Sequence, residues 1–284
     1  MADLSNFNWY PGHMAKAKRA MQDDIKKVDL CIELLDARTP VSSRNPDIDT
    51  LAKGKYRLIL LNKADLADDA RTKAWIERFR EQGIHAIALD SRKNTSLNAV
   101  RKAMEDACRE KREKEKARGI AARPIRAMVC GIPNVGKSTF INSLSGRASL
   151  KTGNKPGVTK ANQWISIGST IQLLDTPGVL WPKFSDRNVG LHLAFIGSIN
   201  EDILPKEELC YEFVKMLQQK EKLPLLETRY EVSFAQIEDP NAMIEMIGRK
   251  RNCLKKGAEV DVLKTSVLIL EDFRSGRLGK VTLE

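Results

Sequence analysis

The sequence predicts an α/β fold, with a parallel sheet between helices and a smaller, mainly helical domain after it. Two observations predict the sheet. Short apolar runs alternate along the chain with longer segments of helical periodicity. One such run, 125–130, leads through the loop Gly131–Ser138 into a helical segment at 139–144. Strand, loop and helix in that order direct backbone N–H groups and the positive end of the helix dipole at an anion.

The domain boundary is predicted from a change of pattern. Strands and helices alternate in the first part of the chain, whereas beyond residue 205 the apolar spacing is helical and is interrupted at Pro224 and Pro240. We therefore place an α/β domain at residues 1–200, with an N-terminal arm at 1–13, and a helical domain at 205–284.

The same periodicity predicts the individual elements. The first half of the chain is expected to form helices at 14–27, 70–82 and 96–118 and strands at 28–35, 57–61 and 84–89, with a loop at 41–55. The second half is expected to form strands at 125–130 and 171–174 and helices at 139–144, 188–199, 206–219, 241–251 and 260–276, with a short segment at 230–234. Charges alternate over 109–116, which is typical of a solvated helix with weak ion pairs, and an RNA-facing stripe is the alternative.

The loop Gly131–Ser138 fits the phosphate-binding pattern G-x-x-x-x-G-K-[ST]. Gly131 and Gly136 permit backbone angles and close approaches that a Cβ would block. Lys137 is expected to reach the β- and γ-phosphates, and Ser138 to bind Mg²⁺. The residues expected to contact the phosphates are Asn134, Val135, Gly136, Lys137, Ser138, Thr139 and Gly178.

The base is expected to be read by Asn62-Lys63-Ala64-Asp65, which follows an apolar strand. A carboxylate at Asp65 can accept hydrogen bonds from both the N1–H and the exocyclic amine of guanine. Adenine offers neither donor at those positions. Its binding would leave the carboxylate buried without hydrogen-bond partners, and the free-energy cost of this disfavours adenine. Asn62 would hold the loop and the stem of Lys63 would cover the base. The alternative is that Asp65 caps the following helix.

Two further polar segments complete a nucleotide site. Asp175-Thr-Pro-Gly178 follows an apolar run, so Asp175 lies at a strand end and is placed to hold Mg²⁺ through water. Gly178 can offer its N–H to a γ-phosphate and move when that phosphate leaves. Thr159, in the polar stretch Pro156–Thr159, is the candidate second hydroxyl ligand of Mg²⁺.

These motifs resemble those of translation-factor-like GTPases, but the guanine motif comes before the phosphate loop. The chain therefore resembles a P-loop GTPase with a circularly permuted motif order. Such a permutation is physically mild, because all the motifs lie at the carboxyl ends of strands of one sheet. The opening Trp9–Met14 and the region Lys250–Lys256 narrow the resemblance to the bacterial ribosome biogenesis GTPase A family.

The resemblance implies a fold, ligands and partners. It implies GTP hydrolysis with Mg²⁺, a partner in the large ribosomal subunit, including rRNA and ribosomal proteins, and a role late in assembly that ends with release after hydrolysis. It also implies a second guanine contact near Ser91 and an RNA-binding helical domain. In that domain the expected RNA-binding residues are Arg249, Lys250, Arg251, Lys255 and Lys256, with a helix end complementing its own dipole as the alternative.

GTP hydrolysis needs a side chain that orients the attacking water, and many GTPases supply it as a glutamine directly after the D-x-x-G motif. The residue after the D-x-x-G motif is Val179, which cannot orient water, so hydrolysis is either very slow or depends on another group. His13, in a Pro-Gly turn of the arm, is the candidate, and the resemblance points to it as well. Its alternative role is packing or capping at a helix start. Relatives with Asn at the position of Asn134 can hold K⁺ between the phosphates, so K⁺ is a second candidate cation.

Charge and cysteine usage fit these expectations. The net charge is +11, and no Asp or Glu occurs between Lys116 and Leu174, which favours a polyanionic partner. Residues 205–284 carry 14 residues of each charge, so an RNA contact there must be a local patch. The five cysteines form no C-x-x-C pair, and no signal peptide or membrane span is recognised, so we expect a cytoplasmic monomer without a membrane partner.

Two other functions fit parts of the sequence. The chain is alternatively an RNA-binding module that uses GTP as a structural ligand with incidental turnover, an interpretation that Val179 favours and that His13 and Thr159 oppose. A P-loop kinase is the third interpretation, but it has no use for Asp65 as a guanine reader and no acceptor-binding motif is recognised.

Overall fold

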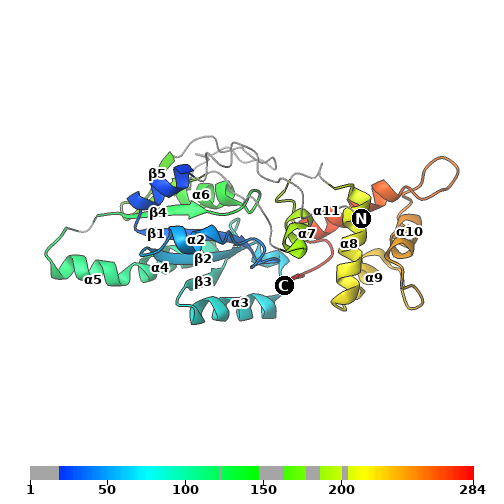
Figure 1. Cartoon of the computed structure of the whole chain (residues 1–284), viewed down its shortest axis with the longest axis horizontal. Coiled ribbons are helices and arrows are strands. Elements are labelled where there is room, and N and C mark those ends of the chain that lie inside the picture. Colours follow the sequence, from blue (N-terminus) through cyan, green and yellow to red (C-terminus); the bar gives the residue numbers. More distant parts are fainter. Residues whose placement is uncertain (1–18, 122, 147–162, 177–185, 200–203) are drawn as a thin grey trace. The chain divides into compact units, whose positions relative to one another are not determined.

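The computed structural model describes residues 19–121, 123–146, 163–176, 186–199 and 204–284 (Figure 1). These residues form two compact units. The α/β unit comprises the described residues up to 176 together with 282–284, and the helical unit comprises those from 186 to 281. The predicted residues His13, Thr159, Gly178 and Val179 lie outside the described part of the chain.

A six-stranded sheet forms the α/β unit, in the order β3-β2-β1-β4-β6-β5. All neighbours are parallel except β5, which is antiparallel to β6. The strands are β1 (Leu30–Asp36), β2 (Tyr56–Asn62), β3 (His85–Ala88), β4 (Ile125–Cys130), β5 (Gln163–Ile167) and β6 (Ile171–Asp175). The central strands are apolar along almost their whole length because helices cover both faces of a parallel sheet.

Helices on both faces bury the sheet (Figure 1). They are α2 (Asp47–Leu51), α3 (Asp69–Glu81), α4 (Asn94–Ala107) and α6 (Lys137–Ser145), whereas α5 (Arg109–Ala117) of the same unit buries none of its residues. On one face, Met21 and Ile25 of the helical segment 19–27 pack with Ile48 of α2 against Cys31 and Met128. Further along the same face, Phe79 of α3 belongs to the apolar cluster with Ile59 and Leu61 of β2. Among the described residues no helix is long and apolar enough to cross a membrane.

Three elements of the α/β unit differ from expectation. The expected helix 96–118 is two helices, α4 and α5, which are separated by a turn at the buried residue Cys108. The expected loop 41–55 contains the short helix α2. The edge strand β5 was not predicted, and its alternation of exposed Trp164 with buried Ile165 is that of a strand covered on one face only.

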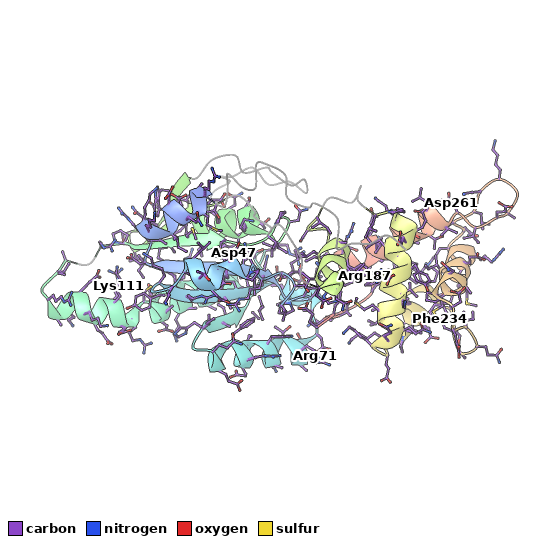
Figure 2. The ribbon with its side chains drawn as sticks, viewed as in Figure 1. Asp47, Arg71, Lys111, Arg187, Phe234 and Asp261 are labelled. Carbon is purple, nitrogen blue, oxygen red and sulfur yellow. The ribbon has the colours of Figure 1, made fainter. Side chains whose placement is uncertain are left out.

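Helix α5 projects from the sheet and buries none of its residues, as its alternating charges predict (Figure 1). Lys111, which is labelled on α5 in Figure 2, pairs with Asp29 at 3.1 Å and with Glu115 at 3.0 Å. Lys114 pairs with Glu110 one turn earlier at 2.5 Å. These ion pairs fit the interpretation of a charged helix held by ion pairs, and the RNA-facing stripe stays a prediction.

The helical unit contains α7 (Arg187–Phe195), α8 (Lys206–Gln219), α9 (Pro224–Tyr230), α10 (Pro240–Lys250) and α11 (Val262–Ser275). Its core includes Phe195, Phe213 and Phe273, whose neighbouring ring centroids lie 5.2 and 4.8 Å apart. Helix α9 was missed because Pro224 was taken as an interruption, whereas proline is favoured in the first turn of a helix. Helix α7, expected in the first domain, packs in this unit with α8 and α11.

Candidate nucleotide-binding site

The predicted motif residues gather at one edge of the sheet. The loops after β1, β2, β4 and β6 all leave the carboxyl ends of parallel strands, which lie side by side in the order β2-β1-β4-β6. The chain runs outward from β1 to β2 and β3 and then returns to place β4 on the other side of β1. Ligands of open α/β sheets bind at such a reversal of strand order.

Two glycines of the phosphate loop lie too close to neighbouring residues to carry a side chain. Gly136 precedes α6 with φ of 100°, and no side chain caps the first turn of this helix. A Cβ on Gly136 would lie 2.6 Å from Nδ2 of Asn62, and one on Gly131 would lie 2.5 Å from the carbonyl oxygen of Leu34. The backbone N–H groups at the start of α6 are therefore placed to bind an anion, as the sequence predicts.

Lys137 lies at the bottom of this loop and is buried. Its Nζ donates to the carbonyl oxygens of Gly131 and Ile132 at 3.0 Å each. Burial lowers the pKa of Lys137 to about 8, although the negative charge of Asp175 opposes this shift. The structure therefore holds an ammonium group whose charge is incompletely compensated, and phosphate oxygens would supply the missing negative charge.

The guanine motif is bound directly to the phosphate loop. Nδ2 of Asn62 donates to the carbonyl oxygen of Val135 at 2.8 Å, and Oδ1 of Asn62 accepts from the backbone N–H of Ser91 at 3.2 Å. Nζ of Lys63 donates to the carbonyl oxygen of Asn134 at 3.0 Å. Asn62 therefore joins three loops, from β2, β3 and β4, as the prediction that it holds the loop requires.

Asp65 does not cap the helix that follows it. The N-cap of α3 is Asp68, whose side chain accepts from the backbone N–H of Arg71 at 2.9 Å. Oδ2 of Asp65 pairs with Arg92 at 2.5 Å, whereas its Oδ1 is buried and has no hydrogen-bond partner among the described residues. A buried acceptor of this kind needs a donor, and the N–H groups of guanine would provide one.

Two of the three expected magnesium ligands, Ser138 and Asp175, belong to the described residues. Ser138 is in the first turn of α6, and Asp175, the last residue of β6, is fully buried. The described residues contain no cluster of three or more His, Cys, Asp or Glu side chains suited to a metal ion. Magnesium bound mainly through nucleotide phosphates, one hydroxyl and water does not need such a cluster.

Comparison with known proteins identifies the family. Ribosome biogenesis GTPase A of Bacillus cereus is 46% identical over 279 residues, which cover 97% of this chain and 93% of that protein. The chain belongs to the ribosome biogenesis GTPase A family. The family protein of Bacillus licheniformis is 44% identical over 97% of both chains, and a domain model described as 50S ribosome-binding GTPase matches residues 126–222.

Solved structures agree with the family assignment. A GDP-bound structure of YlqF from Thermotoga maritima matches with a TM-score of 0.68 and 25% identity, covering 94% of this chain and 98% of that one. A GNP-bound structure of YlqF matches with a TM-score of 0.66 and 26% identity, covering 95% and 97%. As a ribosome biogenesis GTPase A family member, the chain is a GTPase of ribosome biogenesis, and the predicted P-loop fold with circularly permuted motifs is confirmed.

The predicted RNA-binding residues of this GTPase share one region of the helical unit. All five are exposed and lie in the last turn of α10 and the loop after it: Arg249, Lys250, Arg251, Lys255 and Lys256. Arg251 lies over the ring of Tyr230, 5.3 Å from its centroid, and Lys250 pairs with Glu231 at 3.4 Å.

Two other arginines of this unit have structural roles. Arg274 donates through Nε and Nη2 to the carbonyl oxygens of Phe195 and Ala194, at 2.8 Å each. It therefore satisfies acceptors at the end of α7. Arg277 pairs with Asp272 at 3.1 Å.

Neither Asp36 nor Arg92 was assigned to the guanine end from the sequence. The structure places Oδ2 of Asp36 3.1 Å from Nζ of Lys63, and Arg92 beside Asp65. The signal for Asp36 was its position at the end of a strand that neighbours the guanine-motif strand. The predicted contact at Ser91, in contrast, rested on the family resemblance.

Proposed function

We propose that this GTPase binds the assembling large ribosomal subunit in its GTP state, contacts rRNA through the helical unit, and is released after hydrolysis. The observation that carries the proposal is the exposed cationic surface formed by the end of α10 and the loop after it. All five side chains are exposed, so phosphate groups of an RNA would be able to reach their charges. Family membership supports the choice of the ribosome as the source of that RNA.

The proposed nucleotide contacts follow from the geometry of the loops. Asn62, Lys63 and Asp65 would bind guanine, with Ser91 holding Asn62 in place. The phosphates would lie against the start of α6, held by Lys137 and the N–H groups of the phosphate loop, and Gly178 would contact the γ-phosphate. We assign Mg²⁺ to Ser138, Thr159 and Asp175, where it would neutralise phosphate charge.

For hydrolysis we propose His13 as the residue that positions or deprotonates the attacking water, because Val179 cannot do so. We also propose a K⁺ site at Asn134, whose backbone has a φ of 57° in the phosphate loop. A cation there would stabilise negative charge that develops between the phosphates. Both proposals rest on the sequence and on the family resemblance.

The test is GTP turnover with and without purified large subunits in K⁺ buffer, using the whole chain. The wild type is expected to be stimulated strongly, and a Lys255→Glu, Lys256→Glu variant to lose most of the stimulation. Lys220→Glu is the matched control, since it changes an equally exposed lysine of the same unit outside the cationic surface. Full stimulation of the double variant would exclude this surface as the contact.

Binding measurements complete the test. The Lys255→Glu, Lys256→Glu variant would lose two phosphate contacts. The slope of log affinity for the large subunit against log salt concentration should therefore be smaller by about 1.5 than for the wild type. If subunits bind the wild type but turnover stays at the basal rate, the chain acts as an RNA-binding module that uses GTP as a structural ligand. If subunits neither bind nor stimulate, the proposed partner is wrong.

A further inference from the structure

Lys63 of the guanine motif is held by two loops. Its Nζ donates to the carbonyl oxygen of Asn134 in the phosphate loop and lies 3.1 Å from Oδ2 of Asp36, at the end of the neighbouring strand β1. The backbone at Lys63 is left-handed, with φ of 56°, and its side chain is 27% exposed. A lysine stem is flexible, so the carboxylate of Asp36 supplies the charge that fixes the ammonium group.

Asp36 is itself fixed in a buried charged group. It is fully buried and accepts from Nε and Nη2 of Arg38 at 2.9 and 2.8 Å and from the backbone N–H of Arg38 at 3.1 Å. Burial opposes its ionisation, but the charges of Arg38 and Lys63 hold the pKa of Asp36 far below its usual value. Apolar side chains usually fill a buried space at a lower free-energy cost than an ion pair does. The buried pair of Asp36 and Arg38 therefore points to a need for a fixed geometry at this position.

Residues 282–284 hold the loop after β1 from outside. The backbone N–H of Leu283 donates to the carbonyl oxygen of Arg38 at 2.8 Å. The side chain of Glu284 accepts from the backbone N–H groups of Val41 and Ser42 at 2.6 and 3.0 Å, and from Oγ of Ser42. These contacts fix the same loop that carries Arg38.

The same three residues also reach the other side of the guanine motif. Oγ1 of Thr282 accepts from the backbone N–H of Asp68, the N-cap of α3, at 3.1 Å. Thr282 and Leu283 are 2% and 1% exposed. Residues 282–284 therefore tie together the two segments that flank the guanine motif, one after β1 and one at the start of α3.

We propose that Asp36 is a positioning residue for the base end of the nucleotide, acting through Lys63, and that residues 282–284 keep the Asp36 loop in the required geometry. The proposal rests on the proposed role of Asn62–Asp65 in guanine binding. Because Lys63 covers the face of the base, it acts on any purine. Asp65, in contrast, distinguishes guanine from hypoxanthine by the exocyclic amine. A change that acts through Lys63 should therefore weaken the binding of GDP and inosine diphosphate equally, whereas a change at Asp65 should alter the ratio of their affinities.

The experiment measures dissociation constants for GDP and inosine diphosphate with the whole chain. Asp36→Asn removes the charge that holds Lys63 and leaves the charge of Arg38, which repels it. We expect both nucleotides to bind about tenfold or more weakly, with an unchanged ratio between them. Glu77→Gln, an exposed carboxylate on α3, is the matched control and should bind both as the wild type does.

Folding and positioning are separated by a second variant. If Asp36→Asn alone does not fold, Asp36→Asn combined with Arg38→Gln removes both buried charges, and circular dichroism checks its fold. A folded variant with wild-type affinity for GDP would overturn the role of Asp36. An altered GDP to inosine diphosphate ratio would also overturn it, because the effect would then run through Asp65.

Glu284→Gln tests the outer contact. We expect it to raise the dissociation constants for both nucleotides about threefold. In combination with Asp36→Asn it should raise them by less than this further factor, since both changes act on one loop. Wild-type affinity, or full additivity, would refute the role of residues 282–284. Asp65→Asn separates this inference from the proposed function: if it leaves the nucleotide ratio unchanged, the guanine assignment itself is wrong.

Discussion

The charge of Lys137 makes nucleotide binding depend on pH. Burial lowers the pKa of this lysine to about 8, whereas an ordinary lysine titrates near 10.5. Phosphate oxygens bind the protonated form, so affinity should fall as pH rises through the pKa of the free protein. The protonated fraction falls from about 0.9 at pH 7 to about 0.24 at pH 8.5, which predicts roughly fourfold weaker binding of GDP. A lysine with an ordinary pKa would change affinity by only about 1% over this range.

The assay is a fluorescence titration of labelled GDP at several pH values between 7 and 8.5, where about nine-tenths or more of its terminal phosphate is already fully ionised. Lys137→Arg is the matched variant, because a guanidinium stays protonated throughout. It should bind GDP less tightly than the wild type at pH 7 but lose the pH dependence. A flat wild-type profile would refute the lowered pKa. An equal slope in the arginine variant would assign the pH dependence to another group.

Three further predictions test the proposed site. Gly136→Ala should abolish measurable GDP binding while the chain stays folded, since the new Cβ would lie 2.6 Å from Nδ2 of Asn62; calorimetric titration with GDP checks this, and retained binding would contradict it. His13→Ala should bind GTP normally but lower subunit-stimulated turnover by about 10²–10⁴-fold, as measured in a single-turnover assay. Exchange of K⁺ for Na⁺ should slow turnover without changing GDP affinity, and an equal rate in both buffers would exclude the proposed K⁺ site.

The phosphate loop and the guanine motif were predictable because their chemistry is local in sequence. Residues 131–138 carry the glycines, the lysine and the serine in one run, and Asn62–Asp65 is equally compact. Parallel strands end at one edge of a sheet, so local motifs sufficed to predict that these loops meet. The structure bears this out in the hydrogen bond from Asn62 to Val135.

The contacts that sequence analysis missed join distant residues. Glu284 reaches Ser42 across 242 positions, and no local pattern marks either residue. Asp36 resembled an ordinary polar strand end until Lys63 and Arg38 were seen beside it. The break at Cys108 was missed because the helical periodicity of the sequence continues across this residue.

The strand order also sets the sequence of events during synthesis. Strands β1, β2 and β3 are complete before β4, their central neighbour, begins at Ile125, 89 residues after the end of β1 at Asp36. At translation rates of about 5–20 residues per second, one edge of β1 has no partner for about 4–18 s. An unpaired edge of a flat apolar strand is prone to pair with other chains. While the ribosome synthesises this ribosome biogenesis GTPase, one edge of its central strand β1 is therefore expected to be unpaired for several seconds and accessible to chaperones.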